Sequence, residues 1–73
     1  MIVKKEFAQL IRMKRAKDQI SMNELESITG VSRSTLSKIE LEKAQHISSP
    51  IYNTLKNWIE QDQQFYVLNQ ERN

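Results

Sequence analysis

The sequence predicts an all-α fold, a compact domain built from four or five helices. Apolar residues recur at intervals of three and four along most of the 73 residues, which is the spacing of one helix face. No stretch alternates apolar and polar side chains in the way that a half-buried strand does. The length is that of one small domain, so we expect a single domain over residues 1–69 and a disordered tail over residues 70–73.

The first helix is expected over residues 4–17. Asp18 and Gln19 mark its end, and Ile20 is expected to pack at the joint with the following helix. The inward side is predicted from positions at helical spacing: Phe7, Leu10, Ile11, and either Met13 or the aliphatic stem of Lys14.

A second helix is expected over residues 22–29. Ser21 and Glu24 form an S-x-x-E capping box, a pair that satisfies free backbone amides at a helix start. Gly30, the only glycine in the chain, follows where a helix that ends in a left-handed residue favours glycine. Four residues form a partly apolar face of this helix: Met22, Leu25, Ile28 and Thr29.

A third helix is expected from residue 33 to residue 41 or a few residues beyond, with Ser32 as its N-cap. Leu36 and Ile39 give it an inward face, and Val31 is suited to filling the gap between the two helices. The outward face is polar or cationic: Arg33, Ser34, Ser37 and Lys38. Two short helices joined this tightly cannot lie antiparallel, which favours a helix-turn-helix over a plain helical hairpin with a solvated outer face.

A fourth helix is expected after a loop over residues 42–49, with Ser49 as its cap and Pro50 at its first position. Its inward residues stand at helical spacing: Ile51, Leu55, Trp58 and Ile59. The periodicity continues through Phe65 and Leu68, so this helix either runs on or restarts as a fifth.

The pattern E-L-x-x-x-x-G-V-S-x-S-T-L-S-x-I-E over residues 24–40 resembles the lambda-repressor/Cro-like family, also called the XRE family. The resemblance extends from Phe7 to Glu40 and, more loosely, to Ile59. It implies a lambda-repressor-like DNA-binding domain with the helix-turn-helix in helices two and three. It also implies that Arg15 in the first helix pairs with Glu40 at the end of the third.

Two positions depart from the family pattern. Glu26 stands where the family usually has alanine, at the close approach of the two motif helices. We expect there a slightly opened helix pair or a Glu26 side chain that turns outward. Leu41-Glu42 replaces the usual asparagine-glycine turn, which predicts a longer third helix or a rebuilt loop.

These features predict how the chain would contact double-stranded DNA. Base edges are expected to be read by the outward residues of the third helix: Arg33, Ser34, Ser37 and Lys38. Phosphates are expected at the start of the second helix and at two flanking lysines: Ser21, Met22, Asn23, Lys17 and Lys43. Residues 1–17 carry six basic side chains against one acidic one, which suits a phosphate backbone but is also typical of a solvated helix face.

The C-terminal segment is rich in large apolar residues for a short tail. It predicts a homodimer or another protein interface formed by four residues: Ile59, Phe65, Tyr66 and Leu68. The alternative is that Trp58 and Phe65 simply complete the core of the monomer.

Composition argues against the other classes of function. The chain has no cysteine, a single histidine, His46, and a single glycine, so we expect no metal, no cofactor, no glycine-rich phosphate loop and no catalysis. The longest apolar runs are a few residues, so we expect a cytoplasmic protein without a membrane segment or a small-molecule substrate. We therefore expect a sequence-specific DNA-binding protein, and the resemblance implies a small phage- or mobile-element-type transcriptional regulator that binds an operator. The alternative is an anti-repressor or antitoxin-like module that binds another regulator protein.

Overall fold

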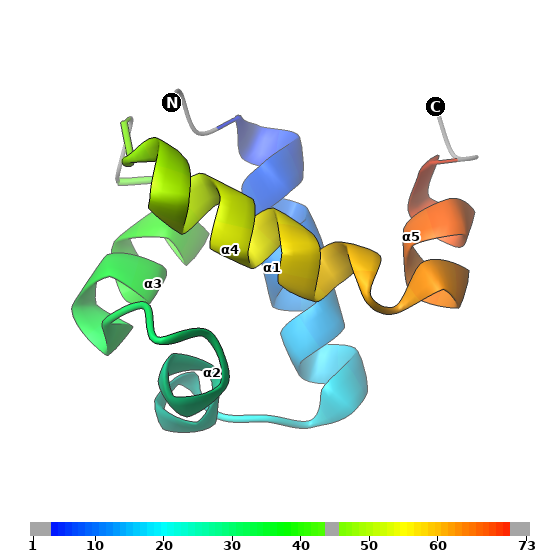
Figure 1. The fold of residues 1–73 in the computed structure, drawn as a ribbon, viewed down its shortest axis with the longest axis horizontal. Coiled ribbons are helices and arrows are strands. Elements are labelled where there is room, and N and C mark those ends of the chain that lie inside the picture. The colour runs from blue at the N-terminus through cyan, green and yellow to red at the C-terminus, as the bar shows by residue number, and fades with distance from the viewer. Residues whose placement is uncertain (1–3, 44–45, 71–73) are drawn as a thin grey trace.

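Five α-helices follow one another in the computed structural model, which describes residues 4–43 and 46–70 (Figure 1). Their bounds are α1 Lys5–Asp18, α2 Met22–Thr29, α3 Arg33–Glu40, α4 Ser49–Glu60 and α5 Gln63–Gln70. The all-α prediction is confirmed, and the periodicity after Ile59 restarts as α5 instead of extending α4. Of the expected C-terminal tail, Gln70 belongs to α5, and residues 71–73 lie outside the described residues.

The helices are arranged around the crossing of α4 over α1 (Figure 1). The pair α2 and α3 lies on one side of this crossing, and α5 lies beyond the C-terminal end of α4 on the other side. The ring of Phe7 on α1 contacts that of Tyr52 on α4, with centroids 4.8 Å apart. The resulting body measures 29 × 24 × 20 Å, so every helix has one face at the surface.

The core draws side chains from all five helices, with Phe65 as the buried residue of α5. Six large residues are fully buried: Ile11, Leu25, Leu36, Ile39, Leu55 and Ile59. Val31 fills the gap between α2 and α3, as predicted. One expectation is wrong in detail: Ile28 is 56% exposed, and Leu25 is the only residue of α2 that is buried. On α1, where Met13 and the stem of Lys14 were alternatives, Lys14 is the buried one and Met13 lies at the surface.

The helix starts follow local side-chain hydrogen bonds. Both bonds of the α2 capping box form: the Ser21 hydroxyl accepts from the Glu24 amide at 3.1 Å, and the Glu24 carboxylate accepts from the Ser21 amide at 3.0 Å. Helix α4 begins one residue earlier than predicted, because the hydroxyl of Ser48, not Ser49, accepts from the Ile51 amide. Pro50 is then the second helical residue, where the missing amide proton has no helical acceptor in any case.

The turn after α3 is a rebuilt loop, and the third helix is not extended. The amide of Lys43 donates to the Lys38 carbonyl at 2.8 Å, and the amide of Glu42 donates to the Ile39 carbonyl at 3.0 Å. These two bonds make a Schellman ending, in which Glu42 adopts φ 60°. That conformation is left-handed and favours glycine or asparagine, so the structure holds a glutamate in a backbone state that suits it poorly.

Candidate nucleic-acid interface

The joint between α2 and α3 is set by Gly30 and its two neighbours. Gly30 has φ 76°, and its amide donates to the Glu26 carbonyl at 2.8 Å, which ends α2. The Thr29 hydroxyl accepts from the Val31 amide at 3.2 Å and donates to the Leu25 carbonyl at 2.8 Å. Hydrogen bonds of Gly30 and of the Thr29 hydroxyl therefore fix the turn. The turn places the start of α3 next to α2.

Glu26 connects the two helices at this point. Its carboxylate accepts a 2.9 Å hydrogen bond from the backbone amide of Arg33, the first residue of α3. A carboxylate there satisfies one of the free amides and lies at the positive end of the α3 dipole. The half-buried Glu26 side chain, which stands where the resemblance favours alanine, thus caps the next helix.

A second bond joins the same two helices through their side chains. The Arg33 guanidinium donates to the side-chain oxygen of Asn23 at 3.2 Å. Asn23 and Glu26 are three residues apart on α2 and lie on the same face, so both reach the first residue of α3. Arg33 is consequently held at its backbone by one α2 residue and at its guanidinium by another.

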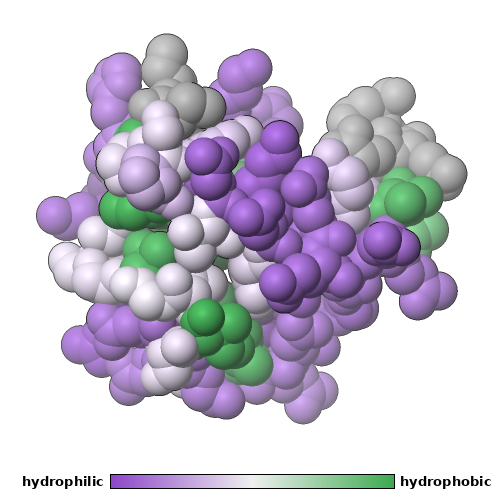
Figure 2. All heavy atoms as spheres, in the orientation of Figure 1, coloured by the Kyte–Doolittle hydropathy of each residue, from purple (hydrophilic) through white to green (hydrophobic). Residues whose placement is uncertain are grey.

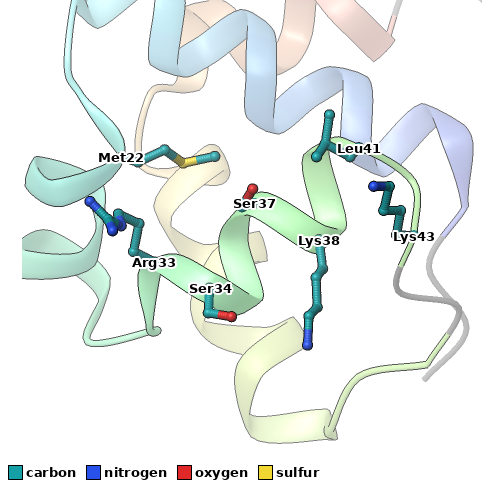
Figure 3. Close-up of a pocket in the computed structure, with 7 residues that line it drawn as sticks. All are labelled: Met22, Arg33, Ser34, Ser37, Lys38, Leu41 and Lys43. Carbon is teal, nitrogen blue, oxygen red and sulfur yellow. The ribbon is translucent and has the colours of Figure 1, made fainter.

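The outer surface of α3 forms the floor of a concavity (Figure 3). Seven side chains line it: Met22, Arg33, Ser34, Ser37, Lys38, Leu41 and Lys43. All four residues predicted to read bases are among them, together with Met22 and Lys43 from the predicted phosphate set. Ser37 lies between Met22 and Leu41 in the close-up, and Ser34 and Lys38 point toward the opposite side of α3 (Figure 3).

Leu41 is the lining residue that the sequence did not single out as part of a surface. It is 62% exposed at the end of α3. The sequence showed that Leu41 departs from the turn residues of the resembling family. It did not show that the turn places this large apolar side chain beside Lys38 and Lys43.

The cations of this concavity differ from those of α1. Within residues 4–43 and 46–70, no carboxylate lies within ion-pair distance of Arg33, Lys38 or Lys43, and no acidic side chain lines the concavity. Most of the basic residues of α1 are instead paired, each with at least one carboxylate: Arg12 with Glu42, Lys14 with Asp18, Arg15 with Glu40, and Lys17 with Asp62. Among the described residues, the cations without an ion pair therefore include the three that line the concavity, whereas the others, Lys4, Lys5 and Lys56, lie outside it.

Lys17 does not line the concavity. Its ammonium group donates to the carboxylate of Asp62, which precedes α5, and the same bond raises the pKa of Lys17. The buried Lys14 reaches the same region, donating to Asp18 at 2.6 Å and lying 4.7 Å from the centre of the Trp58 ring. The phosphate contact predicted for Lys17 therefore stays a prediction, and a phosphate would have to compete with Asp62 for this exposed ammonium group.

The end of α3 is anchored to α1. Glu40 is buried, with 5% of its surface exposed, and accepts two hydrogen bonds from the Arg15 guanidinium at 2.8 and 3.0 Å. The hydrogen bond to Glu40 raises the pKa of Arg15 above its ordinary value. Arg12 adds a bond to the Glu40 carbonyl, one of the groups left without a helical donor at the end of α3.

The predicted dimer surface is only partly accessible. Ile59 and Phe65 are buried within the monomer, and Tyr66 is half-buried against the same core, so these residues follow the alternative reading in which the segment completes the core. Leu68 is 59% exposed and its neighbour Val67 is 49% exposed. Figure 2 shows apolar surface on α5 at the right-hand edge of the molecule.

Other kinds of site find no support in the described residues. His46 is exposed, and no group of three or more histidine and carboxylate side chains is clustered there for a metal ion. None of the helices described is both long and apolar enough to cross a lipid bilayer. Comparisons with protein-family models, with curated proteins and with solved structures found no match to this chain.

Proposed function

We propose that this chain is a sequence-specific DNA-binding transcriptional regulator of the lambda-repressor/Cro-like type, in which α2 and α3 form a helix-turn-helix. One observation supports this most directly: the face of α3 that points away from the core carries cations without acidic partners among the described residues, next to two serine hydroxyls. Such a face suits a polyanion that also presents hydrogen-bond acceptors.

The dimensions of α3 suit the major groove. An α-helix with its side chains is about 10–12 Å across, and the major groove of B-DNA is about 12 Å wide, so the eight-residue α3 fits into it. Arg33 stands at the N-terminal end of α3, the part of a recognition helix that contacts base edges. Its planar guanidinium matches guanine O6 and N7, and Ser34, Ser37 and Lys38 follow on the same face.

The start of α2 is suited to a phosphate. The capping box uses the amides of Ser21 and Glu24, which leaves those of Met22 and Asn23 without an acceptor among the described residues. They lie at the positive end of the helix dipole, and the Ser21 hydroxyl can still donate its proton. Lys43, at the far end of the concavity, supplies a second phosphate contact.

A second copy of the chain would complete the operator contacts. One α3 contacts only a few base pairs, and so few contacts distinguish an operator poorly from the many competing sites of a genome. The exposed apolar pair Val67 and Leu68 on α5 supports a two-fold contact through this helix. We therefore propose a homodimer that binds two half-sites related by the same symmetry.

The experiment is an in vitro selection from random DNA duplexes, followed by fluorescence anisotropy with the selected duplex and with a random one. The selected duplex should bind about 10³-fold more tightly than the random one. Arg33→Ala should lose about 1–3 kcal/mol on the selected duplex. The matched control is Lys56→Ala, which also removes one exposed cation but from α4, outside the concavity, and should change little.

The contrary result is equally clear. If no duplex is enriched and the affinity is the same for all sequences, the proposed function is wrong. Binding to another regulator protein, the alternative that the sequence left open, would then be the function to test.

A further inference from the structure

Asn23 bonds to the residue that is expected to read a base. Its side-chain oxygen accepts from the Arg33 guanidinium at 3.2 Å, across the joint between α2 and α3. Arginine has five donors and no acceptor, so the amide of Asn23 must present its oxygen, not its nitrogen, toward Arg33. The bond uses one terminal nitrogen of the guanidinium and leaves the remaining donors for another partner.

The backbone of Arg33 is fixed by the same helix. Its amide donates to Glu26 at 2.9 Å, and Ser32 caps α3 by accepting from the Thr35 amide at 3.3 Å. With its backbone anchored, the remaining freedom of Arg33 lies in its long side chain, and the bond to Asn23 restricts that freedom before any ligand binds. A side chain ordered in advance loses less conformational entropy on binding.

We infer that Asn23 is a positioning residue for Arg33, and that the preference for guanine at the base facing Arg33 depends on this α2 side chain. This inference rests on the proposed DNA-binding function and deepens it. It assigns to the Asn23 side chain a role different from the phosphate contact predicted from sequence, although the Asn23 backbone amide remains free for a phosphate. Guanine is the base concerned because it alone offers two acceptors, O6 and N7, to a planar pair of donors in the major groove.

Two variants of Asn23 separate positioning from phosphate binding. Asn23→Ala removes the acceptor for Arg33. Asn23→Asp keeps that acceptor and adds a negative charge, which would repel a phosphate. For a positioning residue, Asn23→Ala lowers affinity for the selected duplex about five- to tenfold with little change on random DNA, and Asn23→Asp retains the preference for guanine. For a side chain that only binds phosphate, Asn23→Ala weakens binding to the selected and the random duplex alike and leaves the preference for guanine unchanged.

The double variant Asn23→Ala/Arg33→Ala tests whether Asn23 acts through Arg33. It should bind the selected duplex no more weakly than Arg33→Ala alone, because the group that Asn23 holds is already absent. The same logic applies to a selected duplex that carries 7-deazaguanine opposite Arg33 and therefore lacks the N7 acceptor. On this duplex the wild type and Asn23→Ala should differ little in affinity.

A measurement on the free protein keeps this inference separate from the proposed function. Rotation of the Arg33 guanidinium about its Cζ–Nε bond, measured by NMR, should be slower in the wild type than in Asn23→Ala, while Arg15 serves as an unchanged internal reference. Wild-type protein that selects no sequence overturns the proposed function and this inference with it. Selective wild-type binding together with equal loss by Asn23→Ala on all sequences, or unchanged guanidinium rotation, overturns the inference alone.

Discussion

Arg15 on α1 and Glu40 at the end of α3, 25 positions apart, form a two-point ion pair with N–O distances of 2.8 and 3.0 Å. Its geometry is the parallel pairing that only arginine can give a carboxylate. Because Glu40 is buried, the pair fixes the C-terminal end of α3 relative to α1, while Glu26 fixes the N-terminal end relative to α2. The exposed face of α3 is therefore held at both ends.

We expect Arg15→Met to lower the free energy of unfolding by about 2–3 kcal/mol, because it leaves the buried Glu40 carboxylate without its partner. Arg15→Lys should recover only part of this loss, since an ammonium group cannot make both bonds. Urea denaturation measures the effect. The control Lys5→Met removes an exposed α1 cation that has no ion pair among the described residues and should be nearly neutral. Equal stability of the two variants would show that the pair contributes nothing.

The Glu26 cap predicts an effect at a position where the resemblance favours alanine. Glu26→Ala should cost about 1 kcal/mol, the usual effect of losing a helix cap, because the Arg33 amide then has no side-chain acceptor. Glu26→Gln keeps an acceptor oxygen without the charge and should lose less. Thermal or urea unfolding that ranks alanine above the wild type would contradict the capping role.

Gly30 and Glu42, two of the left-handed positions, should respond in opposite directions. Gly30→Ala meets no atom within 4 Å of the new methyl group, yet φ 76° should make it about 1–2 kcal/mol less stable. Glu42→Gly relieves the backbone strain of a glutamate at φ 60°. It also raises the conformational entropy of the unfolded chain and removes an exposed ion pair with Arg12, and both of these effects lower stability. A net gain of about 0.5 kcal/mol, roughly 2–4 °C in Tm, is expected. A loss on Glu42→Gly would mean that the Arg12 contact outweighs the strain.

Asp62 should make stability depend on pH at the acid end. The hydrogen bond from Lys17, and next the bond from the Phe65 amide, lower the pKa of this carboxyl below its ordinary value of 3.8. The unfolded chain then takes up the proton first on acidification. The stabilisation is complete above pH 3.8 and is lost as the pH falls through the lower, folded value.

Asp62→Asn tests this origin, because it keeps an acceptor for the Phe65 amide but loses the charge. Unfolding curves of wild type and Asp62→Asn should lie apart at neutral pH and converge on acidification. A difference that stays constant over the acid range would show that the charge of Asp62 does not cause it, which would contradict the role of the ion pair with Lys17.

Phe65 and Leu68 should separate folding from association. Phe65→Ala opens a cavity in the core and should cost about 3 kcal/mol, so removal of α5 destabilises the domain itself. Leu68→Glu changes a side chain that is 59% exposed and should leave the monomer stable while shifting sedimentation toward the monomer. A chain that sediments as a monomer before and after this change would remove α5 from the proposed dimer contact.

Local sequence signals determined much of the fold because they act over three or four residues. The Ser21–Glu24 box and Gly30 gave the bounds of α2 correctly, since each signal is complete within one helical turn. The same holds for the outward set on α3, where helical periodicity alone places Arg33 and Lys38 opposite the buried Leu36. The predicted start of α4 is one residue too late, because either of two adjacent serines could cap the helix and the structure uses the first.

Only the tertiary structure decided which partners the charged side chains find. Lys17 pairs with Asp62, 45 positions away, and Glu26 caps α3 at Arg33. No periodic pattern in the sequence predicts either contact. Phe65 and Leu68 are both apolar residues of α5, so their sequence does not tell which of them is buried. Phe65 is buried because of the way in which α5 packs against α4. The sequence by itself determined where helices form, through caps and periodicity. The packing of those helices decided which cations remain free, because an ion pair depends on the distance between side chains and not on their separation along the chain.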